Sequence, residues 1–154
     1  MSGGKLDQKD RDILNALQVD GSLSQRELAD QVGLSQNACW RRLQSLTAAG
    51  VINGSTIKVS RDKIGMELVV FVLIRTRHHS ADWLKELRRA VLNIPEVVDF
   101  FRISGDYDYM AKVITADMNS YDRVYQRLIS SVELDSVTSY FSMETIAEQR
   151  PLKL

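Results

Sequence analysis

Residues 34–52 have the sequence LSQNACWRRLQSLTAAGVI, which predicts one capped amphipathic helix. Ser35 can cap its N-terminus, and Gly50 can end it. On a helical wheel the inward face holds Cys39, Leu43 and Leu46. The outward face holds Asn37, Arg41, Gln44 and Ala48. The helix is therefore expected to pack on one side and to expose a polar side that is free to meet a ligand.

A second capped helix lies directly upstream, in the sequence LSQREL. Ser24 as N-cap and Glu27 three residues later form a capping-box pattern, and Leu23 and Leu28 flank them as a hydrophobic staple. Gly33 can adopt the left-handed conformation that ends this helix. Two helices joined by a short turn that contains glycine have the spacing of a helix-turn-helix.

A first helix precedes this pair. Asp7 can cap it, and it is expected to end at Asp20, which a glycine follows. Its apolar residues recur at helical spacing: Ile13, Leu14 and Leu17. The three short helices make up an N-terminal domain, which we place at residues 1–53.

The outward face of the 34–52 helix has the chemistry of DNA recognition. Asn and Gln side chains pair with the edge of adenine, and Arg pairs with guanine. After the helix, VINGSTIKVS is expected to form a strand-like wing, so that residues 54–65 are a wing strand and linker. The candidate DNA contacts are Ser35, Gln36, Asn37, Trp40, Arg41, Arg42, Gln44, Lys58 and Arg61. Base edges are assigned to Asn37, Arg41 and Gln44, and phosphates to Arg42, Lys58 and Arg61.

An ordinary solvated face, with Trp40 at the edge of the core, would carry the same residues, so the charge distribution matters. The chain of 154 residues has 20 Lys and Arg against 20 Asp and Glu, which alone gives no reason to expect a nucleic acid. Residues 31–64, however, hold five basic side chains and one acidic side chain. Positive charge is therefore concentrated on and just after the helix.

The composition is typical of a soluble globular protein, with 44% hydrophobic residues. The chain has no uninterrupted run of about 18 apolar residues, and its N-terminus lacks a basic segment followed by an apolar one. Cys39 is the single cysteine, so no disulfide framework is indicated. We therefore expect a cytoplasmic protein.

From residue 66 onward the helical periodicity gives way to strands. Residues 68–74, LVVFVLI, are apolar at odd and even positions alike, which predicts a strand covered on both faces. Further strands are expected at 97–103, 107–115 and 137–146, with helices that begin near residue 80 and after Asp117. The order βαββαβ is that of the ferredoxin-like unit, an antiparallel sheet with two helices on one face. The expected fold class is α+β, with this second domain at 66–154.

One face of that sheet is left without a helix. Because the 68–74 strand is apolar on both sides, something outside the subunit must bury the open face, and a second copy of the same sheet is the simplest candidate. The pattern thus predicts a homodimer, which would present two outward-facing helices to two DNA half-sites.

Residues 104–109, SGDYDY, are the most unusual local sequence of the second domain. They fit a tight hairpin whose acidic side chains are simply solvated. They also fit a binding site, because carboxylates and free backbone groups suit the ammonium group of an amino acid, and Tyr107 or Tyr109 can wall its side chain. An enzyme site would need an acid–base pair with a nucleophile or metal, and no such constellation is visible.

Metal and redox chemistry are not indicated elsewhere. His78 and His79 are adjacent and are joined by no Cys or carboxylate cluster, so they are poorly placed to chelate one ion. Cys39 falls on the inward helix face, where a buried inert thiol is expected. We therefore expect no catalytic residue, no metal and no cofactor apart from an amino-acid effector.

Taken together, these segments resemble the leucine-responsive regulatory protein / AsnC family of bacterial and archaeal transcription factors. The resemblance rests on LDQKDRDILNALQVDG, LSQRELADQVGLS, WRRLQSLTAAGVI and SGDYDYMAKV, which occur in the family's order and span most of the chain. It implies a winged helix-turn-helix, a ligand-sensing βαββαβ domain, and dimers that associate into octamers. It also implies an amino acid bound between dimers, near the turn after the second strand. Carried onto this chain, that effector site comprises Gly105, Asp106, Tyr107, Asp108, Tyr140 and Ser142.

The segments FVLIRTRHHSADW and PEVVDFFRISGDYDYM look like a branch of the family that responds to cysteine and controls its breakdown. Where family members often carry Pro and Thr early in the recognition helix, this chain has Gln36, Asn37 and Ala38, so no operator can be carried over. The expected function is a regulator of amino-acid metabolism that binds double-stranded DNA and responds to a small amino acid. The alternative is a stand-alone amino-acid-binding or oligomerisation protein without sequence-specific DNA binding.

Overall fold

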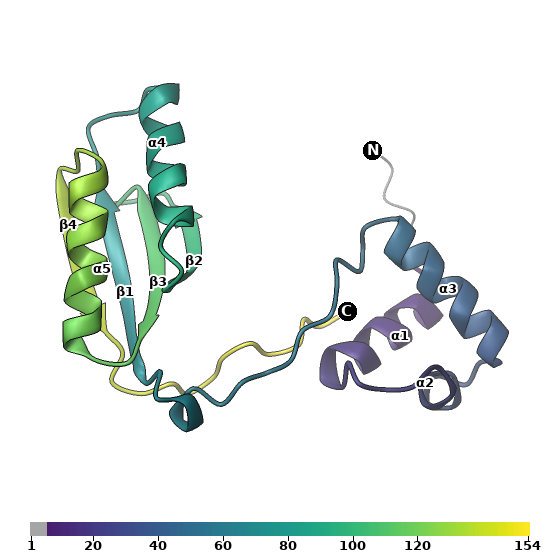
Figure 1. Cartoon of the computed structure of the whole chain (residues 1–154). Coiled ribbons are helices and arrows are strands. Elements are labelled where there is room, and N and C mark those ends of the chain that lie inside the picture. The colour runs from purple at the N-terminus through teal and green to yellow at the C-terminus, as the bar shows by residue number, and fades with distance from the viewer. Residues whose placement is uncertain (1–5) are drawn as a thin grey trace. The chain divides into compact units, whose positions relative to one another are not determined.

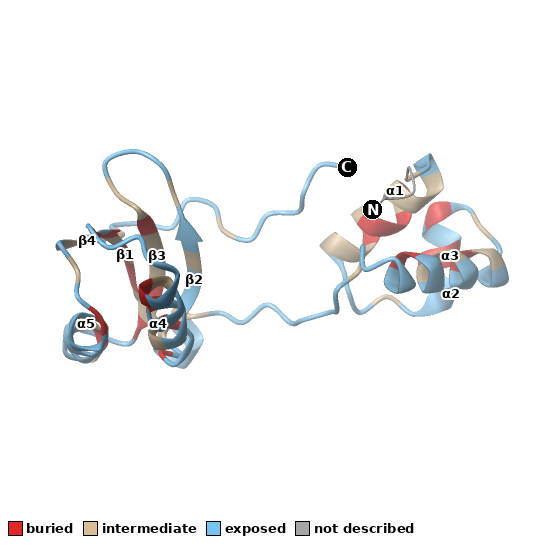
Figure 2. Ribbon diagram, turned by 90° about the horizontal axis from the view of Figure 1, so that it is seen from above, coloured by how far each residue is buried: buried red, intermediate tan, exposed pale blue. Residues whose placement is uncertain are grey.

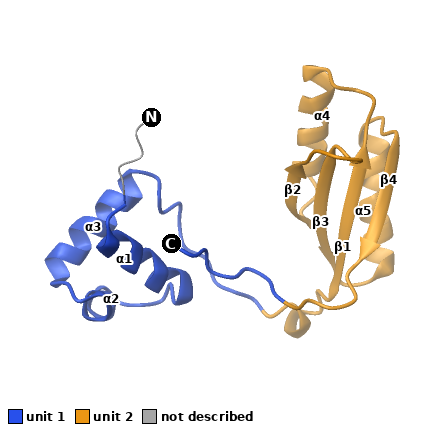
Figure 3. Ribbon diagram, turned by 180° about the vertical axis from the view of Figure 1, so that it is seen from behind, with its two compact units in different colours: residues 1–59, 147–154 blue, residues 60–146 orange. Residues whose placement is uncertain are grey.

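The computed structural model describes residues 6–154, which separate into two compact units (Figure 3). One unit comprises Met1–Val59 together with Ala147–Leu154, and the other comprises Ser60–Ile146. The boundaries expected after residues 53 and 65 thus lie on either side of the observed one. The last residues of the chain group with the first unit rather than with the second. The chain therefore passes between the two units twice.

The first unit contains the three predicted helices, which are α1 (Gln8–Val19), α2 (Gln25–Val32) and α3 (Gln36–Ala48) (Figure 1). Asp7 and Ser24 each close a reciprocal capping box, and Ser35 Oγ accepts a hydrogen bond from the Ala38 amide. Gly33, with φ 66°, ends α2 in the left-handed conformation. The predicted helix-turn-helix is confirmed.

Side chains from all three helices form the core of this unit. Ile13 from α1, Leu28 from α2, and Cys39 and Leu46 from α3 are buried against one another. Burial raises the pKa of the Cys39 thiol, as expected of an inert packing residue. Because α3 contributes its apolar face to this core, its opposite face remains at the surface.

The structure assigns no strand to VINGSTIKVS, the segment expected to form a strand-like wing. Residues 53–60 are extended, but they belong to no strand of the sheet that residues 6–154 form. A strand needs a neighbour that takes up its backbone hydrogen bonds, and no such ladder reaches this segment. Ile57 and Val59 are accordingly 82% and 53% exposed. A single 3-10 turn, η1 (Asp62–Ile64), follows.

The second unit is a four-stranded antiparallel sheet with two helices. The strands are β1 (Leu68–Arg75), β2 (Val97–Arg102), β3 (Tyr109–Thr115) and β4 (Ser136–Phe141). The helices are α4 (Ala81–Leu92) and α5 (Met118–Ser131). The strands lie in the order β2-β3-β1-β4, and the elements follow one another as βαββαβ. The predicted α+β class and the ferredoxin-like order are confirmed.

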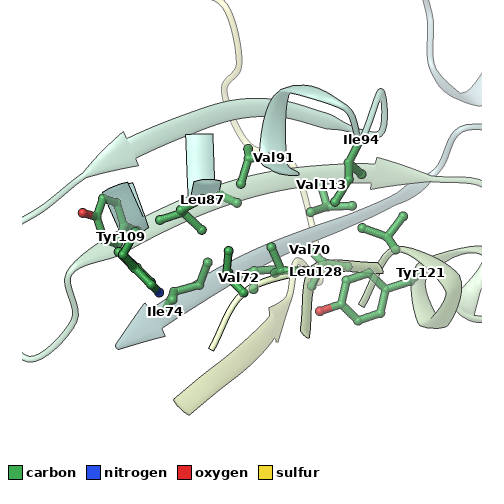
Figure 4. Packing of buried hydrophobic residues seen from close by; sticks show 14 residues of the cluster. Val70, Val72, Ile74, Leu87, Val91, Ile94, Tyr109, Val113, Tyr121 and Leu128 are labelled. Atoms are coloured by element: carbon green, nitrogen blue, oxygen red, sulfur yellow. The ribbon is translucent and has the colours of Figure 1, made fainter. Parts of the chain in front are cut away.

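Both helices cover the same face of the sheet, and the buried residues lie between helices and sheet (Figure 2). Val70, Val72 and Ile74 alternate along β1 toward this face and are almost completely buried. They pack against Leu87 of α4 and Leu128 of α5 (Figure 4). The helix-covered face is thus a closed apolar core.

The other face of the sheet has no helix over it. Phe71 and Leu73 point to it from β1, because they alternate with the core residues of that strand. Phe101 of β2 and Tyr140 of β4 are 50% and 53% exposed. The unit thus leaves an apolar strip at its surface, as the two-sided apolar pattern of residues 68–74 predicted.

Two strands are shorter than the sequence pattern suggested. β3 begins at Tyr109 rather than at residue 107, because the residues before it form the turn that leads into the strand. β4 ends at Phe141 rather than at residue 146. β4 pairs with β1, which begins at Leu68. The Ser142 amide still donates to the Val69 carbonyl, and the residues after it have no strand partner in β1.

Candidate functional site

The predicted base-reading residues lie together on the outward face of α3. Asn37, Arg41 and Gln44 are exposed and are spaced by four and three residues, so they occupy one side of the helix. Trp40, 47% exposed, lies beside them. The helix contains no acidic residue, so no charge on it repels a phosphate backbone. This face therefore combines amide and guanidinium groups without a competing carboxylate on the same helix.

Ser35 and Gln36 lie at the exposed N-terminus of α3. The Ser35 hydroxyl accepts the Ala38 amide at 3.3 Å, which satisfies one of the amides of the first turn. The partial positive charge at the start of a helix favours a nearby phosphate. The position of both residues is compatible with the predicted DNA contact.

Arg42 has a different role from the predicted phosphate contact. Its Nη1 atom donates to Asp7 Oδ2 at 2.7 Å and to Asp10 Oδ1 at 2.8 Å, which joins α3 to the start of α1. These bonds raise the pKa of Arg42. The Asp10 amide, as the larger cause, and Arg42 together lower the pKa of Asp7. Because two carboxylates already hold the guanidinium, Arg42 braces the recognition helix.

The other two basic residues lie outside α3. Lys58 is exposed on the extended segment of the first unit. Arg61 belongs to the second unit, where its Nη2 atom donates to Thr145 Oγ1 at 3.2 Å. The phosphate contacts of Lys58 and Arg61 stay predictions.

The turn between β2 and β3 is the second candidate site. Gly105 has φ 128°, a conformation that side-chain-bearing residues rarely adopt. The amide of Asp108 donates to Ile74 O at 2.9 Å, and the amide of Ile103 donates to Asp108 O at 2.8 Å. Asp108 Oδ2 accepts the Thr76 amide at 2.8 Å. The Asp108 carboxylate therefore fixes the turn to the end of β1.

Tyr107 connects this turn to the open face of the sheet. Arg75 Nε donates to Asp106 O at 2.7 Å, and the Arg75 guanidinium lies 5.4 Å from the centroid of the Tyr107 ring. The Tyr107 hydroxyl donates to Thr138 Oγ1 at 3.4 Å. A hydrogen bond with Tyr107 is also the largest cause of the raised pKa of Tyr140. The turn thus gathers one guanidinium, the exposed side chain of Asp106 and two phenols.

Ser142, also predicted to join this site, lies elsewhere in the chain. Its amide donates to Val69 O, five strand residues away from Ile74 at the turn. At about 3.3 Å per residue this separation is roughly 17 Å. The Ser142 hydroxyl donates to Glu144 O at 3.1 Å. Within one chain, Ser142 therefore does not line the turn.

Sequence reasoning missed Arg75, Thr76 and Thr138. Arg75 ends the buried strand β1 and Thr76 follows it, and polar residues at the end of a strand were a usable signal. Thr138 reaches the site only through the β1–β4 register, in which it pairs with Leu73, and the sequence carries no signal for that register. Tyr109, considered as an alternative to Tyr107, is 4% exposed and belongs to the helix-covered core, so it does not wall the turn.

The two histidines form no metal site with their neighbours. His78 Nε2 lies 3.4 Å from Glu133 Oε2. Over residues 6–154, no group of three or more His, Cys, Asp or Glu side chains is arranged to hold an ion. The contacts of His78 are therefore those of a polar loop residue.

Two family models match the chain. Residues 6–53 match a winged helix-turn-helix DNA-binding model, and residues 69–152 match the Lrp/AsnC ligand binding domain. The chain belongs to the Lrp/AsnC family. It is a DNA-binding transcriptional regulator of the Lrp/AsnC type, as the resemblance predicted. The alternative without sequence-specific DNA binding finds no support in these matches.

Relatives cover almost the whole chain. The DNA-binding transcriptional activator DecR of Escherichia coli is 44% identical over 142 residues, which are 92% of this chain and 93% of DecR. The glutamate uptake regulatory protein of Zymomonas mobilis is 43% identical over 150 residues, 97% of this chain and 92% of that protein. A crystal structure of a transcriptional regulator–L-Met complex from Neisseria meningitidis has a TM-score of 0.91 at 29% identity, covering 97% of each chain. Because these family members are regulators, the prediction that this chain is not an enzyme is confirmed.

Proposed function

We propose that this regulator controls genes of amino-acid metabolism by reading DNA with the outward face of α3, under the control of a small amino acid held at the β2–β3 turn. The exposed set Asn37, Arg41 and Gln44, on a helix without carboxylates, is the observation that carries the DNA part. Lys58 and Arg61 supply phosphate contacts in this proposal. The proposed place of action is the cytoplasm. Among the helices of residues 6–154, none is long and apolar enough to cross a bilayer.

The proposed assembly starts from a dimer formed by the open sheet faces of two copies. The apolar strip on this face supports it, because the half-buried Phe71 and Leu73 and the exposed Phe101 are stabilised when they are covered. A twofold dimer would present two α3 helices to half-sites about one helical turn of DNA apart, or a multiple of it. Further association of dimers into octamers is part of the proposal, and sedimentation velocity tests it.

The DNA part is tested by comparing Arg41→Ala with Lys58→Ala on a footprinted operator and on an unrelated duplex, across a salt series. Arg41→Ala is expected to weaken operator binding by about 1–3 kcal/mol and to leave the unrelated duplex nearly unchanged, because a base contact carries sequence information. Lys58→Ala should weaken both duplexes equally and lower the salt slope by about 1. An Arg41→Ala variant with intact operator affinity and intact sequence preference would refute the assignment.

The effector part rests on the groups gathered at the β2–β3 turn. The Asp106 carboxylate suits the ammonium group of an amino acid, the Arg75 guanidinium suits its carboxylate, and Tyr107 with Tyr140 can wall a side chain. The L-Met bound to the Neisseria relative supports an amino acid as the class of ligand. Cysteine is our finer candidate, from the resemblance of this chain to a cysteine-responsive branch.

A calorimetric screen of the twenty amino acids, with sedimentation of each mixture, tests the effector part. We expect heat for at least one small amino acid, and a coupling to DNA affinity of about 1–3 kcal/mol. Asp106→Ala should abolish that heat, while Asp122→Ala, an exposed acid on α5, should leave it intact. If no amino acid gives heat or changes the sedimentation, the turn is only a structural hairpin.

A further inference from the structure

The C-terminal segment 147–154 groups with the helix-turn-helix unit and not with the unit that it follows (Figure 3). Gln18, in the last turn of α1, contacts it directly. Gln18 Nε2 donates to Leu152 O at 3.2 Å, and Gln18 Oε1 accepts the Leu152 amide at 2.7 Å. The Gln18 side-chain amide thus hydrogen-bonds both the N–H and the C=O of one residue. This is the pattern of a hydrogen-bonded residue pair between antiparallel strands.

The segment itself has features of a defined conformation. Gln149 has φ 49°, the one positive φ of a non-glycine residue within residues 6–154, and such a conformation persists where the surroundings hold it. Pro151 has a fixed φ and restricts Arg150 before it to extended conformations. Leu152 is 72% exposed. The segment is therefore bound at this point through its backbone rather than by burial of the Leu152 side chain.

We infer that the end of α1 is a docking site for the chain's own C-terminal segment, latched by Gln18, so that the 60–146 unit is tied to the DNA-binding unit at both of its ends. A unit attached at both ends has fewer accessible orientations than a unit on a single linker. Two exposed hydrogen bonds make a weak latch, which opens and closes readily. In this inference the latch is also the path by which the effector state of the 60–146 unit reaches α3. That last step rests on the proposed function, whereas the docking does not.

Hydrogen exchange at the Leu152 amide of the full-length protein tests the docking. Gln18→Ala should speed that exchange about five-fold or more, because the amide loses its acceptor. Gln8→Ala is the matched control: Gln8 lies on the same helix, and its amide donates to Asp12 within that helix. Gln18→Glu keeps an acceptor for the Leu152 amide and should fall between wild type and Gln18→Ala. Equal exchange rates in wild type and Gln18→Ala would overturn the docking.

A cysteine pair made by Val19→Cys and Leu152→Cys keeps the Gln18 side chain and reports which copy of the chain supplies the segment, because Val19 is 73% exposed at the end of α1. Cys39 is fully buried and the pKa of its thiol is raised, so it does not compete for a maleimide. With a short bismaleimide we expect a cross-linked species with the mass of one chain. Cross-linked species with the mass of two chains would overturn docking within the chain.

The transmission step is measured as the ratio of operator affinities with and without L-cysteine or L-methionine. Gln18→Ala, and a chain that ends at residue 148, should each bring this ratio closer to one, by about three-fold or more. The operator affinity without effector should stay unchanged. An unchanged ratio in variants whose Leu152 exchange is accelerated, or whose segment is absent, would overturn transmission. If wild type shows no effector response, the proposed function and the transmission step fail together, and the exchange and cross-linking results still decide the docking.

Discussion

Replacing Gly105 with alanine measures how firmly the β2–β3 turn is held. An ideal Cβ at this position meets no atom within 4 Å, so the substitution causes no clash with a neighbour. The penalty comes from φ 128°, which side-chain-bearing residues avoid at a cost of about 1–3 kcal/mol. The bonds from Ile103 to Asp108 and from Arg75 to Asp106 keep the turn from relaxing. We therefore expect the free energy of unfolding of the second unit to fall by about 2 kcal/mol.

Urea unfolding followed by Trp83 fluorescence, in a Trp40→Phe background, isolates that unit. Trp83 is buried, and its ring centroid lies 6.1 Å from that of Tyr109, which follows the turn. Gly54→Ala is the matched control, because Gly54 has φ 142° and equally empty surroundings but lies on the unpaired extended segment. It should leave the Trp83 transition unchanged. Protein concentration is held fixed, because association shifts apparent stability.

A loss smaller than about 0.5 kcal/mol for Gly105→Ala, comparable to an ordinary surface substitution, would refute the reasoning. The turn would then be free to adopt another backbone conformation. In that case its hydrogen bonds would not preorganise it for a ligand.

Two further predictions concern single contacts. Asp108→Ala removes the acceptor of the Thr76 amide, and Thr76 is only 5% exposed. The free energy of unfolding of the second unit should therefore fall by about 1–3 kcal/mol in the same urea assay. Asp106→Ala should leave it unchanged. Asp7→Asn keeps the N-cap acceptor but removes the charge that Arg42 binds. Because folding lowers the pKa of Asp7 from 3.8, its contribution to stability is present above that value and is lost as the pH falls through the folded-state pKa. Acidification should therefore destabilise the first unit less in Asp7→Asn than in wild type, as measured by Trp40 fluorescence, and identical pH profiles would contradict the role of Asp7.

The predictions that the structure confirms depend mostly on neighbours in the chain. The cap side chains of Asp7, Ser24, Ser35 and Asp117 each accept a hydrogen bond from an amide three residues later. The cap and its partner therefore lie within one short stretch of sequence. The unbroken apolar run at 68–74 likewise showed that both faces of this strand are apolar. Such patterns were sufficient for the helix-turn-helix, the βαββαβ order and the apolar open face of the sheet.

The sequence by itself determined where the helices begin and which of their faces are apolar, because a cap or a periodic pattern involves residues within a few positions. Only the tertiary structure decided that Arg42 meets Asp7, 35 positions away, and that Gln18 meets Leu152, 134 positions away. It also left VINGSTIKVS without a strand partner and Ser142 away from the turn. The physical reason is that an exposed guanidinium, amide or extended backbone can bind several partners. The fold selects the partner by bringing one of them within hydrogen-bonding distance.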